Sequence, residues 1–297
     1  RAESIFQCNI IMKVINNLDH LKSELKKQGS IALVPTMGNI HDGHLSLVRY
    51  AKKCADIVIC TVFVNKLQFN ERADFLSYPR TIDNDLKRLE MNKADIVFVP
   101  PGELMYPCEQ EFFIEVPEYI SECLEGEFRG PFFSRVATIV MKFFFLIRPD
   151  IAIFGKKDFQ QAFMIKELCS QFATQCTILL GETIRDLDGL ALSSRNSHLS
   201  SSERANANQM YKTLVNIKEE ILKNNEVEYF NLKFLRQLED TGRDRLNKEG
   251  WECEYIKIIN KDVFREPICP KTEWRQLIVL AAARLGGTRL IDNIEIV

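Results

Sequence analysis

The stretch IALVPTMGNIHDGH, residues 31–44, decides the fold, because a buried-strand pattern in it passes directly into the start of a helix. Its first six residues are mostly apolar, as expected of a strand buried on both faces of a parallel sheet. Helical spacing of apolar residues follows over 45–53. A strand that leads through a tight turn into a helix is the unit from which doubly wound α/β sheets are built.

The same alternation continues through the first two thirds of the chain. Short apolar runs occur at 56–64, 94–99, 150–154 and 177–180, and amphipathic segments lie between them at 82–91, 136–147 and 159–172. Five strands alternating with helices predict a doubly wound parallel sheet, which we assign to a domain over 1–183.

The pattern changes after about residue 184. Ser200 and Glu203 form a capping box that opens a predicted helix to about 224, and a second helix is expected over 228–249. Two strands are then expected, over 251–259 and 276–283. We therefore predict a smaller α+β domain over 184–297.

Composition narrows the class of protein. The chain has 297 residues, of which 46% are hydrophobic, enough to fill sizeable cores. A net charge of -2 provides no broad basic field for nucleic acid or an anionic membrane, so small molecules are the expected partners. The longest apolar runs, such as 139–147 with Lys142 inside it, are far shorter than the roughly 20 residues of a transmembrane helix.

The cysteines and the first residues indicate a cytoplasmic protein. The nine cysteines are odd in number and include no CxxC pair, as expected of reduced thiols. Residues 1–9 lack the basic flank and apolar core of a signal peptide.

The first candidate site follows the first strand. His41 and His44 lie three residues apart at the predicted start of a helix, where both rings can donate to phosphate oxygens. Gly38 and Gly43 allow the backbone to approach a ligand closely. A capped helix with two incidental histidines is about equally compatible with this motif alone. Zinc is less compatible, because no third His or Cys stands at a matching spacing.

Three further polar segments follow predicted strands, at the sheet edge where ligands bind in parallel α/β folds. Asn65 and Gln68 in FVNKLQF (63–69) offer neutral amides to a carboxylate or a hydroxyl. The segment GKKDFQQ (155–161) offers lysines to a polyphosphate and a glutamine to a second substrate, and ALSSRN (191–196) offers hydroxyls beside an arginine. Each segment alone could be an ordinary polar loop, helix start or turn, but four together favour one site.

The ordered series of motifs resembles the pantothenate synthetase family, the pantoate–β-alanine ligases. The motifs are PTMGNIHDGH, FVNKLQF, YPRTIDNDL (78–86), FGKKDFQQ, ALSSRN and ARLGGTRLIDN (283–293), and the match extends from Lys13 to the C-terminus. The resemblance implies a Rossmann-like N-terminal domain, a smaller C-terminal lid domain and a homodimer.

The resemblance also implies a reaction. In this family the carboxylate of pantoate attacks the α-phosphorus of Mg-ATP, giving pantoyl adenylate and pyrophosphate. The amine of β-alanine then attacks the activated carbonyl and releases AMP and pantothenate. Negative oxygen charge builds up in such transition states, so fixed cations and N–H donors should dominate catalysis.

Site residues are carried over from the family motif by motif. The resemblance implies that His41, His44, Lys157 and Arg195 are catalytic, with His44 a proton donor. It implies an ATP site of Met37, Gly38, Asn39, Ile40, His41, Asp42, Gly43, His44, Gly155, Lys156, Lys157, Asp158, Ile184, Leu192, Ser193, Ser194 and Arg195. It implies that Gln68 and Gln161 bind pantoate, that Gln68 also serves β-alanine, and that Asp85 is a direct or second-sphere partner of Mg²⁺.

The chain departs from the family pattern at several positions. Lys66 replaces a usual proline, Lys156 an acidic residue, Leu192 a methionine, Phe132 a histidine and Arg135 a glycine. Lys156 is expected to add positive charge beside the phosphates. Because Phe132 and Arg135 change a whole segment, a nucleotide-binding protein without catalysis is an alternative.

A second alternative is an HxxH nucleotidyltransferase that acts on a phosphate ester, which would favour more cations than Gln68 and Gln161 provide. A tRNA-binding synthetase is disfavoured, because no basic anticodon-reading domain is evident.

Overall fold

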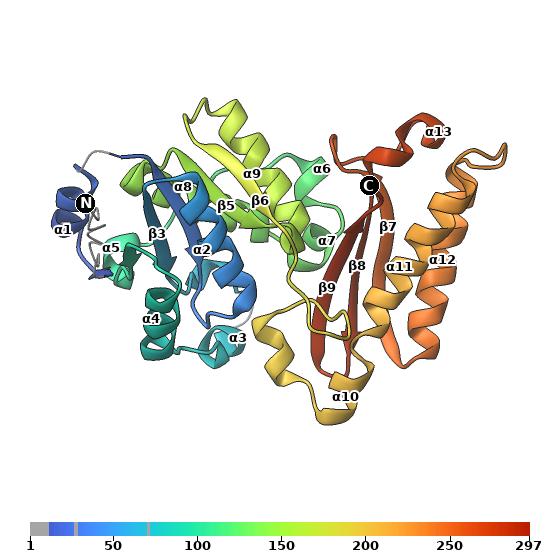
Figure 1. Ribbon diagram of the computed structural model, residues 1–297, viewed down its shortest axis with the longest axis horizontal. Helices are drawn as coiled ribbons and strands as arrows, with labels where there is room; N and C mark the ends of the chain where they lie inside the picture. Colours follow the sequence, from blue (N-terminus) through green and yellow to red (C-terminus); the bar gives the residue numbers. More distant parts are fainter. Residues whose placement is uncertain (1–11, 27–28, 70–71) are drawn as a thin grey trace, which may run out of the picture.

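The computed structural model describes residues 12–26, 29–69 and 72–297. Its larger part is built around a parallel sheet of six strands, which lies on the left of Figure 1. The strand order is β1-β4-β3-β2-β5-β6, with every pair parallel. The strands are β1 (Lys13–Ile15), β2 (Ile31–Thr36), β3 (Ile57–Val62), β4 (Ile96–Phe98), β5 (Ile151–Gly155) and β6 (Thr177–Gly181). All five predicted strands are present, and the doubly wound α/β class is confirmed.

Helices cover both faces of this sheet. On one face, Ala32 and Val34 of β2 pack with α2 (Asp42–Cys54) and α4 (Ile82–Met91). On the other face, Leu33 packs with α1 (Leu18–Leu25), α8 (Phe132–Ile147) and α9 (Phe159–Gln171). Alternate residues of one strand thus enter two separate cores, which is why the strands read as continuous apolar runs. The short helices are α3 (Arg72–Ser77), α5 (Gly102–Met105), α6 (Glu118–Ser121) and α7 (Glu125–Arg129).

The last third of the chain forms a three-stranded antiparallel sheet, in the order β7-β8-β9. Its strands are β7 (Trp251–Asn260), β8 (Leu277–Leu285) and β9 (Thr288–Glu295), and its helices are α10 (Ser201–Asn206), α11 (Gln209–Asn224), α12 (Leu232–Lys248) and α13 (Pro270–Glu273). One sheet face packs on α11 and α12. The other face, with Ile278 and Leu280, joins the core of α8 and α9. A boundary at 183/184 stays a prediction, because this core continues across it.

Three details differ from the sequence prediction. The predicted helix over 200–224 is two helices, the first of which ends at Asn206, where the side-chain amide donates to the carbonyl of Glu249 at 2.8 Å. Helix α8 begins at Phe132, one turn before the predicted residue 136, directly after Pro131. Strands β1 and β9 were not predicted. Strand β1 has only three residues, and β9 buries the polar Asp292 and Asn293, so neither strand has a long continuous apolar run. The prediction that residues 1–9 do not form a signal peptide concerns a segment outside the described residues.

Candidate active site

The loop between β2 and α2 is held by one buried carboxylate. Gly38 has φ +82°, and a Cβ at this position would lie 3.0 Å from Oδ2 of Asp85. The two carboxylate oxygens of Asp85 accept the backbone N–H groups of Asn39 at 2.9 Å and Ile40 at 2.8 Å, and the hydroxyl of Thr81 at 3.0 Å. Asp85 is 1% exposed. Its carboxylate therefore holds the shape of the loop. Of the two roles expected of Asp85 toward Mg²⁺, only the second-sphere role is compatible with these contacts.

We expect Asp85→Asn to destabilise the protein by roughly 1–3 kcal/mol, because an amide cannot accept both backbone N–H groups and leaves one buried donor unsatisfied. Asp83→Asn is the matched control, since Asp83 lies exposed in the same first turn of α4. Urea unfolding of the two variants measures the difference. Equal midpoints would contradict the assigned role of Asp85.

The two histidines of the motif form a stacked pair at the start of α2. His41 is the N-cap residue and His44 lies in the first turn, with ring centroids 3.9 Å apart. The backbone N–H of His41 donates to Nδ1 of His44 at 3.3 Å, so a neutral His44 carries its proton on Nε2. A Cβ at position 43 would lie 2.8 Å from Cε1 of His41, so glycine is required to seat this ring. Nδ1 of His41 is buried and has no hydrogen-bond partner among the described residues.

Both imidazoles are neutral at neutral pH. Burial lowers the pKa of His41 to about 4, and the nearby charges of Lys157 and Arg88 add to the effect. Burial lowers the pKa of His44 to about 3, with His41 and Lys157 contributing. His44 therefore offers a neutral Nε2–H as a hydrogen-bond donor, and an anion beside it would be needed before it could carry a second proton.

These lowered pKa values predict a loss of stability in mild acid. An unfolded histidine takes up a proton near pH 6.5, whereas the folded pair does so only near pH 4 and 3. The unfolded chain binds more protons in that window, so the free energy of unfolding falls as the pH drops through it. We expect a variant with His41→Asn and His44→Gln to lose less stability between pH 7 and pH 5 than the unmodified protein. Urea midpoints at both pH values measure this, and identical losses would contradict it.

Lys157 faces the histidines from the end of β5. It lies in η2 (Lys156–Asp158), whose backbone is held by Asn293 of β9: the side-chain amide of Asn293 donates to the carbonyls of Lys156 and Lys157, each at 2.9 Å. The ammonium of Lys156 instead pairs with Glu182 at 2.7 Å and Glu295 at 2.6 Å. The expectation that Lys156 adds charge beside the phosphates is therefore wrong, since two carboxylates neutralise it.

The segment after β6 folds back over the site. Leu192 donates its backbone N–H to the carbonyl of Ile184 at 2.9 Å, and Arg185 makes a bidentate pair with Asp292 of β9 at 2.6 and 2.8 Å. Ser193 then caps η3 (Ser194–His198), accepting the N–H of Arg195 at 3.3 Å. The half-buried Tyr78 lies beside Ser194, and desolvation raises the pKa of its hydroxyl. The second sheet thus fixes the serine and arginine side of the site.

Two glutamines complete the arrangement. Gln68 accepts a hydrogen bond from Nδ2 of Asn65 at 2.9 Å, so its own amide nitrogen remains available. Gln161 lies on the first turn of α9 and faces the cavity, whereas its neighbour Gln160 is buried and donates to the carbonyls of Ile120 and Cys123. Of these two neighbouring glutamines, only Gln161 lines this cavity.

One cavity of about 240 Å³ collects most of the predicted residues. It is lined by Met37, His41, Gly43, His44, Gln68, Gly155, Lys157, Asp158, Gln161, Ile184, Leu192, Ser193, Ser194 and Arg195. The predicted residues Gly38, Asn39, Ile40, Asp42, Lys156 and Asp85 are not among the residues lining it. Asp42 pairs instead with Arg88 of α4.

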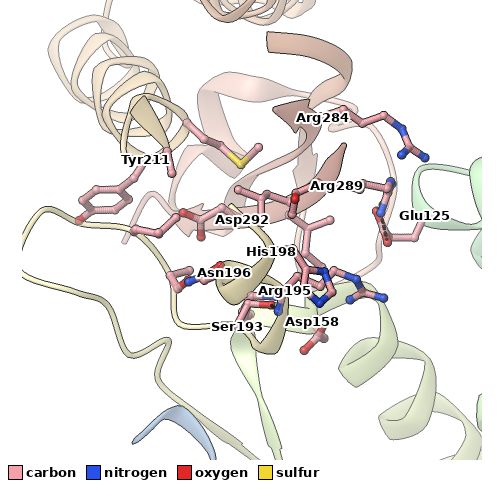
Figure 2. A pocket seen from close by; sticks show the side chains of 18 of the residues that line it. Glu125, Asp158, Ser193, Arg195, Asn196, His198, Tyr211, Arg284, Arg289 and Asp292 are labelled. Atoms are coloured by element: carbon pink, nitrogen blue, oxygen red, sulfur yellow. Dashed lines mark hydrogen bonds and ion pairs between the residues drawn. The ribbon is translucent and has the colours of Figure 1, made fainter. Parts of the chain in front are cut away.

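A second cavity of about 390 Å³ adjoins the first and shares Gln68, Lys157 and Arg195 with it. Figure 2 shows Arg195, Ser193 and Asp158 close together on one side of it and the pair of Arg289 and Glu125 on another. Arg289 donates to the two oxygens of Glu125 at 2.9 and 2.7 Å, which joins β9 to α7. The wider site therefore lies between the two sheets.

The sequence reasoning missed two parts of the wall. Arg129 lines both cavities, and its guanidinium lies 3.3 Å from the ring centroid of Phe132. Burial lowers the pKa of Arg129 to about 10, within the range where it stays charged at neutral pH. An apolar wall along α8 was also missed, although its helical spacing could have revealed it: Phe132, Val136, Ile139, Val140 and Phe143. Of the two departures in this segment, Phe132 lines the cavity and Arg135 does not.

Fold and site together define a class. A parallel sheet whose strand leads into a histidine pair at a helix N-terminus, opposite a lysine and an arginine, is the arrangement of an ATP-using enzyme of the HxxH nucleotide-binding class. Residues 10–295 match the family described as pantoate-beta-alanine ligase, and the chain belongs to that family. It is a carbon–nitrogen ligase that uses ATP to condense pantoate with β-alanine to pantothenate.

Solved structures agree with this assignment. Pantothenate synthetase from Thermus thermophilus is 30% identical, with 96% of this chain and 99% of that chain covered and a TM-score of 0.87. Pantoate-beta-alanine ligase from Francisella tularensis, complexed with beta-gamma ATP and beta-alanine, is 32% identical, with 96% and 98% covered and a TM-score of 0.76.

Proposed function

We propose that this chain activates pantoate as an adenylate inside the cavity of about 240 Å³ beside the carboxyl ends of β2 and β5. The carboxylate oxygen of pantoate attacks the α-phosphorus of ATP, the bond to the bridging oxygen breaks, and pyrophosphate leaves. The amine of β-alanine then attacks the acyl carbon, loses a proton, and displaces AMP. The observation that carries this proposal is the cavity of about 240 Å³ that holds two histidines, a lysine, an arginine and two amides on facing walls.

The nucleotide side of this cavity supplies donors rather than acids. We assign His41, His44, Ser193 and Ser194 to hydrogen bonds with the phosphates, and Lys157 and Arg195 to the charge that develops as pyrophosphate departs. The lowered pKa values support this assignment, because a neutral imidazole can donate a hydrogen bond through its N–H group without transferring the proton. Donors fixed before the reaction stabilise the transition state most, since they need not reorganise.

The pantoate side combines an apolar wall with amides. Pantoate has a branched carbon skeleton, which suits the side chains of Val136, Val140 and Phe143. Its carboxylate and hydroxyls need donors, which we assign to Gln68 and Gln161. Neutral amides hold the carboxylate without stabilising its charge as strongly as a cation would, so it stays nucleophilic. Gln68, which faces both cavities, is also assigned to β-alanine.

Magnesium would enter with the nucleotide. Among residues 12–26, 29–69 and 72–297, no group of three or more His, Cys, Asp or Glu side chains could hold a metal ion. This fits a Mg²⁺ ion ligated mainly by phosphate oxygens and water, which would lessen the negative charge of the polyphosphate. Asp85 would act on it only from the second sphere, through the loop that it holds.

A homodimer and a cytoplasmic location belong to the same proposal. Eight cysteines lie within the described part of the chain, and all are free thiols, as expected in a reducing compartment. No helix in that part is both long enough and apolar enough to cross a membrane. Sedimentation velocity of the purified protein would test the dimer.

AMP formation tests the proposed reaction. AMP is measured with ATP alone, with ATP and pantoate, and with ATP, pantoate and β-alanine. Rapid turnover is expected only in the last mixture. Rapid turnover with a phosphate ester in place of pantoate would favour a nucleotidyltransferase instead, and ATP binding without AMP in any mixture would favour a protein without catalysis.

A further inference from the structure

Lys142 is the one charged residue inside the apolar run 139–147, and its side chain contacts the segment that contains Tyr106. Its ammonium donates to the carbonyl of Met105 at 2.6 Å and to Oε1 of Gln110 at 2.5 Å, and lies 4.3 Å from the ring centroid of Tyr106. The Tyr106 ring is 8% exposed and also contacts Phe63. A cation on its face and an aromatic ring beside it hold this phenol in one position.

The Tyr106 hydroxyl donates to Oδ1 of Asn65 at 2.6 Å. The backbone N–H of Leu67 points to the same oxygen, at 3.3 Å. A backbone N–H can only donate, so Oδ1 and Nδ2 of Asn65 are distinguished, and Nδ2 must be the atom that donates to Oε1 of Gln68 at 2.9 Å. With its oxygen taken, Gln68 presents its NH₂ group to the cavity.

We propose that Tyr106 is a positioning residue for substrate recognition, acting through Asn65 to turn the NH₂ group of Gln68 toward the pantoate carboxylate or hydroxyl. Tyr106 lines neither the cavity that holds the two histidines nor the adjoining cavity that holds Arg289 and Glu125, so it acts at a distance from the substrate. This inference rests on the proposed role of Gln68. It adds a residue that none of the sequence motifs contains.

Tyr106→Phe keeps the ring and removes only the hydroxyl. We expect it to raise the KM for pantoate about five- to tenfold, as the loss of one buried hydrogen bond would. The KM for ATP and kcat should change less than about twofold, because the nucleotide wall is untouched. The matched control is Tyr229→Phe, which removes a 2.7 Å hydrogen bond from the loop before α12 to Asn224 at the end of α11 and should leave all three parameters unchanged.

A double-mutant cycle separates positioning from a general structural effect. Tyr106→Phe is compared in the unmodified chain and in a Gln68→Ala background. A rise in the pantoate KM that disappears when Gln68 is absent supports the proposal. An equal rise in both backgrounds, or no rise in the unmodified chain, would overturn it.

If the proposed reaction is wrong, the unmodified chain will form no AMP when ATP, pantoate and β-alanine are supplied. This outcome is distinct from any effect of Tyr106→Phe. Pantoate dissociation constants, measured by calorimetry on the same four proteins, then provide the same comparison without turnover.

Discussion

Lys157→Ala is expected to slow pantoate-dependent exchange between ATP and pyrophosphate by a factor on the order of 10² to 10³, the cost of removing one fixed donor from a developing negative charge. Lys157 lines both cavities and lies close enough to His41 and His44 to lower the pKa of each. Its backbone is fixed by Asn293, so the side chain can be removed without disturbing the turn.

The neighbouring Lys156 provides the matched control. Lys156 carries the same charge one residue away but is bound to Glu182 and Glu295. Lys156→Ala should therefore leave exchange within a few-fold of the unmodified enzyme, at some cost in stability. Near-normal exchange by Lys157→Ala, or an equal loss in both variants, would refute the specific role of Lys157.

His44→Ala is expected to slow the same exchange by a factor on the order of 10², because a preorganised Nε2–H donor disappears from the phosphate side. The pair of stacked rings also loses one member, and the backbone N–H of His41 loses its acceptor. Since the imidazole is neutral, we expect the loss to be similar at pH 6 and pH 8.

His20→Ala is the control for this variant, because His20 lies exposed on α1. Circular dichroism of both variants shows whether the fold is retained. A His44→Ala enzyme that exchanges normally would refute the assignment, and a steep dependence of its residual activity on pH would point to another group as the donor.

Much of the fold was predictable because parallel strands buried on both faces consist of continuous apolar runs, which are visible in the sequence. Strand β2 and the turn that follows it are readable from residues 31–44 alone. Strand β9 was not predicted, because it buries Asp292 and Asn293 for contacts with Arg185 and the 156–157 turn. Those contacts join segments more than a hundred residues apart, and no local pattern contains them.

The candidate site divides in the same way. Residues that belong to a sequence motif, such as His44 and Lys157, were predicted, and they line one cavity. Residues that act through tertiary contacts were not: Arg129 lies over Phe132 at the junction of the two cavities, and Lys156 is neutralised by Glu295 from the last strand. Charge near a site is visible in a sequence, but the partner that cancels it is not.

If the pantoate carboxylate itself attacks the α-phosphorus of ATP, one of its oxygen atoms must end up in AMP. The most direct test supplies pantoate labelled with ¹⁸O in its carboxylate, together with ATP and β-alanine, and measures the mass of the AMP produced. We expect AMP that carries one ¹⁸O atom in its phosphoryl group, because the attacking oxygen stays on phosphorus when the amine displaces AMP. Unlabelled AMP formed alongside pantothenate would contradict it.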